Sequence, residues 1–111
     1  MTDLPEFLQD LPSALIPLEG LTNHLIQGPG QQVIIMSFEK ETEVPEHAHE
    51  AQWGVVLDGV MELTISGKSV TLRKGDSYFI PKGAVHSAKI HAGYQDLCIF
   101  NQPDRYRVGA D

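Results

Sequence analysis

The sequence predicts an all-β protein of one domain, in which short antiparallel strands close into a β-barrel or jelly roll after a short N-terminal helical turn. Glycine, proline and aspartate interrupt the chain at intervals of roughly 8–12 residues, a spacing typical of sandwiches and barrels. Apolar and polar residues alternate between these interruptions: Met61, Leu63 and Ile65 share one face of a predicted strand. The intervals leave no room for a long helix.

The elements follow in chain order. A helical turn is expected over 4–11, where Phe7, Leu8 and Leu11 have helical spacing. Strands are expected over 15–18, 21–27, 32–38, 46–49, 52–57, 61–66, 69–73, 77–80, 86–91 and 96–100. Tight turns are expected at Gly67-Lys68 and at Asp58-Gly59, because glycine tolerates positive φ. We expect residues 1–29 to form an N-terminal arm with the helical turn and the first strands, and residues 30–111 to form the barrel core.

Composition and charge exclude several classes of protein. The chain has 111 residues, and 15 acidic against 8 basic side chains give a net charge of −7. Such an acidic chain without a basic cluster is not expected to bind nucleic acid. Its apolar runs are far shorter than the roughly 20 residues of a membrane span, and its N-terminus does not resemble a signal peptide. With Cys98 as the single cysteine, we expect a cytoplasmic protein whose partners are small molecules and other protein chains.

Two histidines one residue apart, His47 and His49, are the first candidate metal ligands. On a strand such side chains share a face, so both imidazoles can reach one metal ion. Gln52 opens the next predicted strand, and His86 ends a second segment that glycine and proline frame. The alternative is that His47 and His49 are surface histidines beside the acidic stretch from Glu39 to Glu50, which is typical of a solvated loop.

Taken together, these two segments resemble the motifs of the cupin superfamily. Its second motif, G-x5-P-x-G-x2-H-x3-N, is matched at Gly75, Pro81, Gly83 and His86, with Ile90 in place of the asparagine. Its first motif, G-x5-H-x-H-x3,4-E-x6-G, is matched at His47, His49 and Gly59. There the leading glycine is replaced by Glu41, and Gln52 stands in place of the glutamate, after a gap of two residues.

The resemblance implies a small β-barrel that holds one divalent transition metal ion. His47, His49 and His86 would be ligands, and Gln52 would be the fourth ligand or a close neighbour. Imidazole ligands suit Zn, Ni, Fe, Mn or Cu. Because glutamine is neutral, the metal would keep its full positive charge and would polarise a bound oxygen more strongly.

Within the superfamily, the chain has a weaker resemblance to the cupins of pectin and alginate degradation, which open unsaturated uronates. These proteins use His, His, Gln and His at the metal and carry a segment Asp-x-Phe-x-Pro-x-Arg. The present sequence has Phe100, Pro103 and Arg105 with a different spacing, and Cys98 stands where the aspartate would be.

Three functions are compatible with these residues. The first is a metal-dependent enzyme that acts on a small oxygenated molecule by isomerisation, ring opening or dioxygenation. The second is a non-catalytic binding or sensor domain, and the third is a barrel that a metal only stabilises. No motif fixes a catalytic residue; the titratable candidates are Glu62, Tyr78, Tyr94, Asp96 and Arg105.

The sequence also predicts the positions of four residues outside the proposed ligand set. His24 and His91 lie outside the motifs and are not expected to bind metal. Cys98 is expected in the core, with a pocket-lining position as the alternative. Trp53 must point away from Gln52, and with Val55 and Leu57 it forms an apolar strip on the outer face. Because the outer faces of cupin barrels often pair with another subunit, we expect a homodimer.

Overall fold

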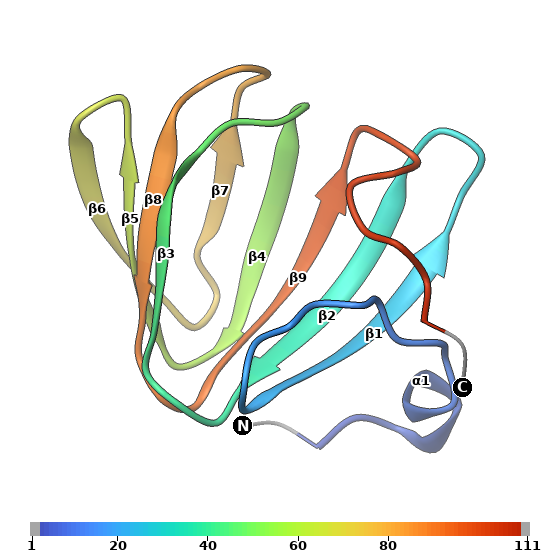
Figure 1. Cartoon of the computed structure of the whole chain (residues 1–111). Helices are drawn as coiled ribbons and strands as arrows, with labels where there is room; N and C mark the ends of the chain where they lie inside the picture. Colours follow the sequence, from blue (N-terminus) through green and yellow to red (C-terminus); the bar gives the residue numbers. More distant parts are fainter. Residues whose placement is uncertain (1–2, 110–111) are drawn as a thin grey trace.

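The computed structural model describes residues 3–109 and has two antiparallel sheets that face each other (Figure 1). Its elements are helix α1 (Glu6–Gln9) and strands β1 (Leu21–Gln27), β2 (Gln32–Phe38), β3 (Thr42–His47), β4 (Gln52–Asp58), β5 (Val60–Ile65), β6 (Lys68–Arg73), β7 (Ser77–Ile80), β8 (His86–Ile90) and β9 (Tyr94–Phe100). The predicted all-β fold with a short helical turn is confirmed. Within 3–109, no helix is long and apolar enough to cross a membrane.

Strand order places the C-terminal strand in the middle of one sheet. The five-stranded sheet has the order β1-β2-β9-β4-β7, and the four-stranded sheet has the order β3-β8-β5-β6. Alternate residues of each strand point between the sheets, and the core includes Leu25, Ile34, Val56, Tyr94 and Phe100, all at most 2% exposed. The cavity described below lies among these inward side chains.

The prediction of a strand over 15–18 is wrong. Within that stretch Pro17 has no N–H to give to a ladder, and the N–H of Leu18 donates to the carbonyl of Ile16 in a tight turn. The only pairing nearby is an isolated bridge between Ala14 and Val108. The segment therefore crosses the open side of the barrel as an irregular strap (Figure 1).

Buried amides hold this strap and a second one, residues 105–109, in place. Asn23 on β1 binds both backbone groups of Ala14: its Oδ1 accepts from the N–H at 2.7 Å, and its Nδ2 donates to the carbonyl at 3.2 Å. Gln32 on β2 binds Tyr106 in the same way, at 2.9 and 2.8 Å. Each amide thus satisfies backbone groups that have no neighbouring strand.

The predicted strand 46–49 is shifted, and the stretch from Glu39 to Glu50 is not simply a loop. Strand β3 begins at Thr42 and ends at His47, so His49 lies beyond it. Thr42 and Val44 are half-buried while Glu43 is exposed, an alternation typical of an edge strand that charge protects from further pairing. The register shifts between Val44 and His47, where Pro45 interrupts the ladder.

Both predicted turns lie where the chain reverses, with two differences. The β5–β6 hairpin turns at Ser66 and Gly67, with φ of 49° and 81°, one residue earlier than predicted. Asp58-Gly59 does not close a hairpin, since β4 and β5 belong to different sheets. The turn at Gly59 instead carries the chain from one sheet to the other.

The amide of Gln32 should contribute measurably to stability. We expect Gln32→Leu to lower the free energy of unfolding by roughly 1–3 kcal/mol, because it leaves both backbone groups of Tyr106 without a partner. The measurement is urea denaturation, with Gln31→Leu as the control, since Gln31 is the exposed neighbour. Equal losses in the two variants would contradict this role of Gln32.

Candidate metal centre

Three imidazoles from separate positions of the chain meet at one end of the cavity. His47 is the last residue of β3, His49 lies in the following loop, and His86 is the first residue of β8. The ring centroids are 5.1 Å apart for His47 and His49, 4.1 Å for His47 and His86, and 4.6 Å for His49 and His86. One ring nitrogen from each lies within 4.8 Å of the others. The structure therefore brings together the three histidines that the sequence singled out.

Hydrogen bonds to the backbone fix which nitrogen of each ring is free. The Nδ1 atoms of His47, His49 and His86 lie 2.9, 2.7 and 2.9 Å from the carbonyl oxygens of residues 45, 50 and 84. A carbonyl oxygen only accepts, so each Nδ1 carries a proton, and in the neutral form of each ring the lone pair is on Nε2. This tautomer is the one that binds a metal through Nε2.

The surroundings keep two of these rings neutral. Burial, with smaller contributions from the nearby charges of Arg105 and His86, lowers the pKa of His49 to about 4, although the hydrogen bond to the Glu50 carbonyl opposes this shift. Burial also lowers the pKa of His86. Because protonated imidazole cannot bind a metal, both shifts favour the ligand form at neutral pH.

Gln52, the fourth predicted ligand, lies at the same level of the barrel. It is 8% exposed and pairs across the sheet with Phe100, whose ring contacts that of His49 at a centroid distance of 5.3 Å. Its Nε2 lies 3.4 Å from the Tyr78 hydroxyl and 3.3 Å from Cys98 Sγ. The amide oxygen makes no hydrogen bond within the described part of the chain and is therefore available as a ligand.

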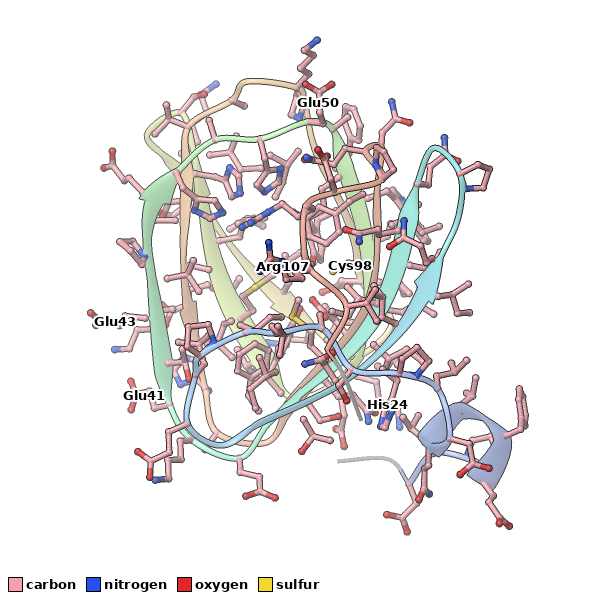
Figure 2. All side chains as sticks on the ribbon, turned by 45° about the vertical axis from the view of Figure 1, so that its right-hand side comes forward. His24, Glu41, Glu43, Glu50, Cys98 and Arg107 are labelled. Carbon is pink, nitrogen blue, oxygen red and sulfur yellow. The ribbon has the colours of Figure 1, made fainter. Side chains whose placement is uncertain are left out.

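The cavity beside this cluster has a volume of about 410 Å³ and mostly apolar walls, within the range of small-molecule sites. Arg105 and Arg107 line it from the second strap, and Arg107 is visible between the two sheets (Figure 2). The guanidinium carbon of Arg105 lies 4.6 Å from the centre of the Tyr106 ring. The Nε atom of Arg105 is buried without a hydrogen-bond partner, and the Arg105 side chain forms no ion pair with any residue of 3–109.

Three buried polar groups, those of Tyr78, Asp96 and Cys98, line the deep end of the cavity, and Tyr94 is hydrogen-bonded to Asp96. The hydroxyls of Tyr78 and Tyr94 both donate to Asp96 Oδ2 at 2.8 Å, and Cys98 Sγ lies 3.0 Å from the Tyr78 hydroxyl. Burial raises the pKa of Asp96, while hydrogen bonds from the tyrosines and the thiol oppose the shift. Burial and the Asp96 charge also raise the pKa values of Tyr78, Tyr94 and Cys98, so all three keep their protons.

The structure also shows where the other residues singled out in the sequence lie, relative to the three imidazoles. Glu62 is on the outer face and binds His91 at 2.8 Å, which removes both from the cavity. His24 lies on β1 and is not part of the cluster (Figure 2). Cys98 satisfies both predicted alternatives, since it is 2% exposed and also lines the cavity.

Sequence reasoning missed Arg107 and the strap residues 15–18, which line the cavity. The spacing of Arg105 and Arg107, two residues apart after the last strand, was the available signal for Arg107. The strap gave no signal of this kind, because its four residues resemble an ordinary apolar strand.

Comparisons with known proteins agree with this architecture. An uncharacterized protein of Aquifex aeolicus (strain VF5) is 48% identical over 50 residues, which are 44% of this chain and 41% of that protein. The chain thus spans less than half the length of this relative. An RmlC-like cupin from Shewanella frigidimarina NCIMB 400 has a TM-score of 0.73 at 25% identity, over 85% of this chain and 86% of that chain.

Two further solved structures share the fold at lower identity. KdgF from Halomonas sp. has a TM-score of 0.72 at 22% identity, over 84% of this chain and 87% of that chain. An oxalate decarboxylase of Bacillus subtilis with Mn(II) centres has a TM-score of 0.70 at 20% identity, over 87% of this chain and 29% of that chain. The model of the Cupin domain family matches residues 34–100, which include every histidine of the cluster. The chain belongs to the cupin domain family.

Proposed function

We propose that this protein is a metal-dependent enzyme that acts on a small carboxylate with a further oxygen group. The observation that carries the proposal is the position of three Nε2 lone pairs and two arginines around one cavity. The three histidines would bind a metal ion, and the two arginines would bind an anionic ligand.

The donor set supports a divalent transition metal at His47, His49 and His86, with Gln52 as an oxygen ligand. Three neutral imidazoles and an amide suit Zn, Ni, Fe, Mn or Cu better than Mg or Ca, which prefer oxygen ligands throughout. The Mn(II) centres of the structurally similar oxalate decarboxylase support the same class of ion. When bound, such an ion acts as a Lewis acid on a ligand oxygen or, if it is redox-active, activates dioxygen.

Charge supports a carboxylate as the ligand. Among the residues that line the cavity, Arg105 and Arg107 are cationic and only Asp96 is acidic, although the whole chain has a net charge of −7. A metal ion with neutral ligands would add two further positive charges. Guanidinium groups bind carboxylates with two parallel hydrogen bonds, and Arg105 has no other anion to bind among the described residues.

The straps add apolar surface to the site. Leu15, Ile16 and Tyr106 line the cavity, and an apolar lining strengthens charge interactions inside it. Isomerisation, ring opening and dioxygenation are the reactions that fit a polarised carboxylate in such a site. The alternative is a domain that binds the same ligand without converting it. An assay for turnover distinguishes this domain from the enzyme.

We further infer that two copies of the chain associate through the outer face of the five-stranded sheet. One row of outward residues crosses all five strands, from Ile26 through Val33, Ile99 and Trp53 to Phe79. The adjacent row is His24, Ile35, Leu97, Val55 and Ser77. Neither row contains a charged residue.

The contrast with the other sheet favours a second copy as the partner of this face. On the outer face of the four-stranded sheet, Glu62 pairs across strands with Lys89, and Lys89 pairs with Glu43. Four strands about 23 Å long and the shorter β7, about 4.8 Å apart, present a flat area of roughly 400–500 Å² before side-chain relief is added. This is more than half of the roughly 800 Å² per partner of a standard interface, and projecting side chains such as Trp53 and Phe79 add to it.

Metal content tests the ligand assignment. We expect the protein, purified without a His tag or chelator, to contain close to one transition metal ion per chain. His86→Ala should remove most of it, and His24→Ala should not, because His24 is remote from the cluster. Mass spectrometry of the metals makes the comparison, and equal metal contents in the two variants would refute the assignment.

Ligand binding tests the carboxylate proposal. We expect lactate to bind the metal-loaded protein and lactamide, which has the same shape without the charge, to bind at least about 10-fold more weakly. Arg105→Ala should weaken lactate binding by about the same factor, whereas Arg73→Ala, on the outer face of β6, should not. Calorimetry gives the affinities.

Turnover is then assayed with a panel of hydroxy-carboxylates, keto-carboxylates and uronates. Conversion of one of them would support the enzyme, while binding without any turnover would support the binding domain. Equal affinities for lactate and lactamide would refute the proposal that the ligand is a carboxylate.

Self-association is tested at Trp53, which is 42% exposed at the centre of the outer face. We expect Trp53→Glu to convert the dimer to a monomer in sedimentation velocity, because it places a charge in the desolvated centre of the interface. Its metal content should stay unchanged. An unaltered sedimentation coefficient would show that this face is not the interface.

A further inference from the structure

A chain of hydrogen bonds connects the deep end of the cavity to Gln52. It starts at Asp96, whose Oδ2 accepts from the hydroxyls of Tyr78 and Tyr94 at 2.8 Å each. It continues from the Tyr78 hydroxyl and Cys98 Sγ to the Nε2 atom of Gln52, at 3.4 and 3.3 Å. Asp96 and Cys98 are 4% and 2% exposed, so bulk water does not interrupt the chain.

The direction of these hydrogen bonds follows from the chemistry of their ends. Tyr78 gives its hydroxyl proton to Asp96, so its oxygen faces Gln52 as an acceptor. The Cys98 sulfur is an acceptor for an amide N–H as well. Both groups therefore match the nitrogen of the Gln52 amide and leave its oxygen on the other side.

Strand register shows where that other side lies. Gln52 pairs with Phe100 of β9, and one step deeper Gly54 pairs with Cys98 and with Tyr78. Tyr78 and Cys98 thus lie on the deep side of Gln52. The imidazole of His49, in the loop that precedes β4, packs against the Phe100 ring and therefore lies away from the deeper level of Tyr78 and Cys98.

Gly54 is needed for this arrangement. A Cβ at this position would come within 2.5 Å of the Tyr78 hydroxyl oxygen, so any larger residue would displace the phenol ring. The ring lies over Gly54, and from this position its hydroxyl contacts both Asp96 and Gln52. The absence of a side chain at residue 54 is therefore necessary for the contact between Tyr78 and Gln52.

We propose that Asp96 and Tyr78 are positioning residues for the metal centre, which hold the Gln52 amide so that its oxygen faces the three imidazoles. The inference rests on the proposed metal site and adds residues that would never touch the ion. Asp96 lies on the strand next to that of Gln52. By accepting the hydrogen bond from Tyr78, it would determine whether the oxygen or the nitrogen of the Gln52 amide faces the metal. An amide free to rotate would offer its nitrogen, which does not bind metal, as often as its oxygen.

The experiment measures Co²⁺ binding and the visible absorption spectrum of the Co²⁺ protein, without any substrate. We expect Tyr78→Phe to weaken Co²⁺ binding by about 10-fold and to shift the spectrum toward that of Gln52→Leu, since partners of this kind typically contribute 10–100-fold in affinity. In the Gln52→Leu background, Tyr78→Phe should change neither the affinity nor the spectrum further.

Tyr94→Phe is the matched control. It removes a hydroxyl from the same Asp96 oxygen, but Tyr94 does not contact Gln52, so Co²⁺ affinity and spectrum should stay close to those of the unaltered protein. Thermal unfolding without metal separates a loss of stability from a loss of positioning. If Tyr78→Phe fails to fold, Cys98→Ala removes the other acceptor of the amide and carries the same expectation in a weaker form.

The outcomes separate this inference from the proposed function. Equal effects of Tyr78→Phe and Tyr94→Phe, or full additivity with Gln52→Leu, would refute the positioning role and leave the metal site intact. Failure of the unaltered protein to bind Co²⁺ would refute the metal site itself. A selective effect of Tyr78→Phe that disappears in the Gln52→Leu background would support the inference.

Discussion

The pairing of β4 with β9 sets the positions of three polar side chains in the cavity, those of Gln52, Cys98 and Asp96. These two strands lie side by side in the five-stranded sheet, with Gln52 opposite Phe100, Gly54 opposite Cys98 and Val56 opposite Asp96. Each step of two residues moves about 6.8 Å deeper into the barrel. Gln52, the Cys98 thiol and the buried Asp96 carboxyl group therefore lie at successive levels of one ladder, and a shift by one residue would turn all of them to the outer face.

The imidazoles depend on a different and more local constraint. Only His86 starts a strand in regular register, whereas His47 follows a bulge and His49 lies in a loop. What orients all three is a hydrogen bond from Nδ1 to a backbone carbonyl one or two residues away in sequence. Each short segment thus aims its own ring, and the sheets need only bring the segments within a few ångströms of one another.

The sequence predicted the strands that turn residues bound clearly and missed those that other forces determine. Strands 32–38 and 77–80 were predicted to the residue, because each is a short, mostly apolar stretch that glycine, proline or aspartate closely precedes or follows. The segment 15–18 looks equally apolar, but Pro17 has no N–H to donate to a ladder, and the N–H of Leu18 is used in a tight turn. Thr42 was not predicted as a strand start, because the exposed glutamates of an edge strand resemble a loop.

The site shows the same division. The spacing of the motifs was enough to single out His47, His49 and His86, which the fold brings together. No local pattern pointed to the partnership of Asp96, Tyr78 and Gln52, since these residues come from three different strands. Their relation depends on sheet order, and sheet order is a long-range property. The role of Arg107 was hidden for a related reason, because it follows the last strand in a segment with no periodicity.

The two straps are hydrogen-bonded to each other as well as to the barrel, so their stabilities depend on each other. The backbone of residue 15 donates to the carbonyl of Arg107, and that of Gly109 to the carbonyl of Ser13. Neither strap can leave the barrel without breaking hydrogen bonds to the other, and each is also held by a buried amide. Opening is thus a small cooperative unfolding event whose free energy is a sum over both segments.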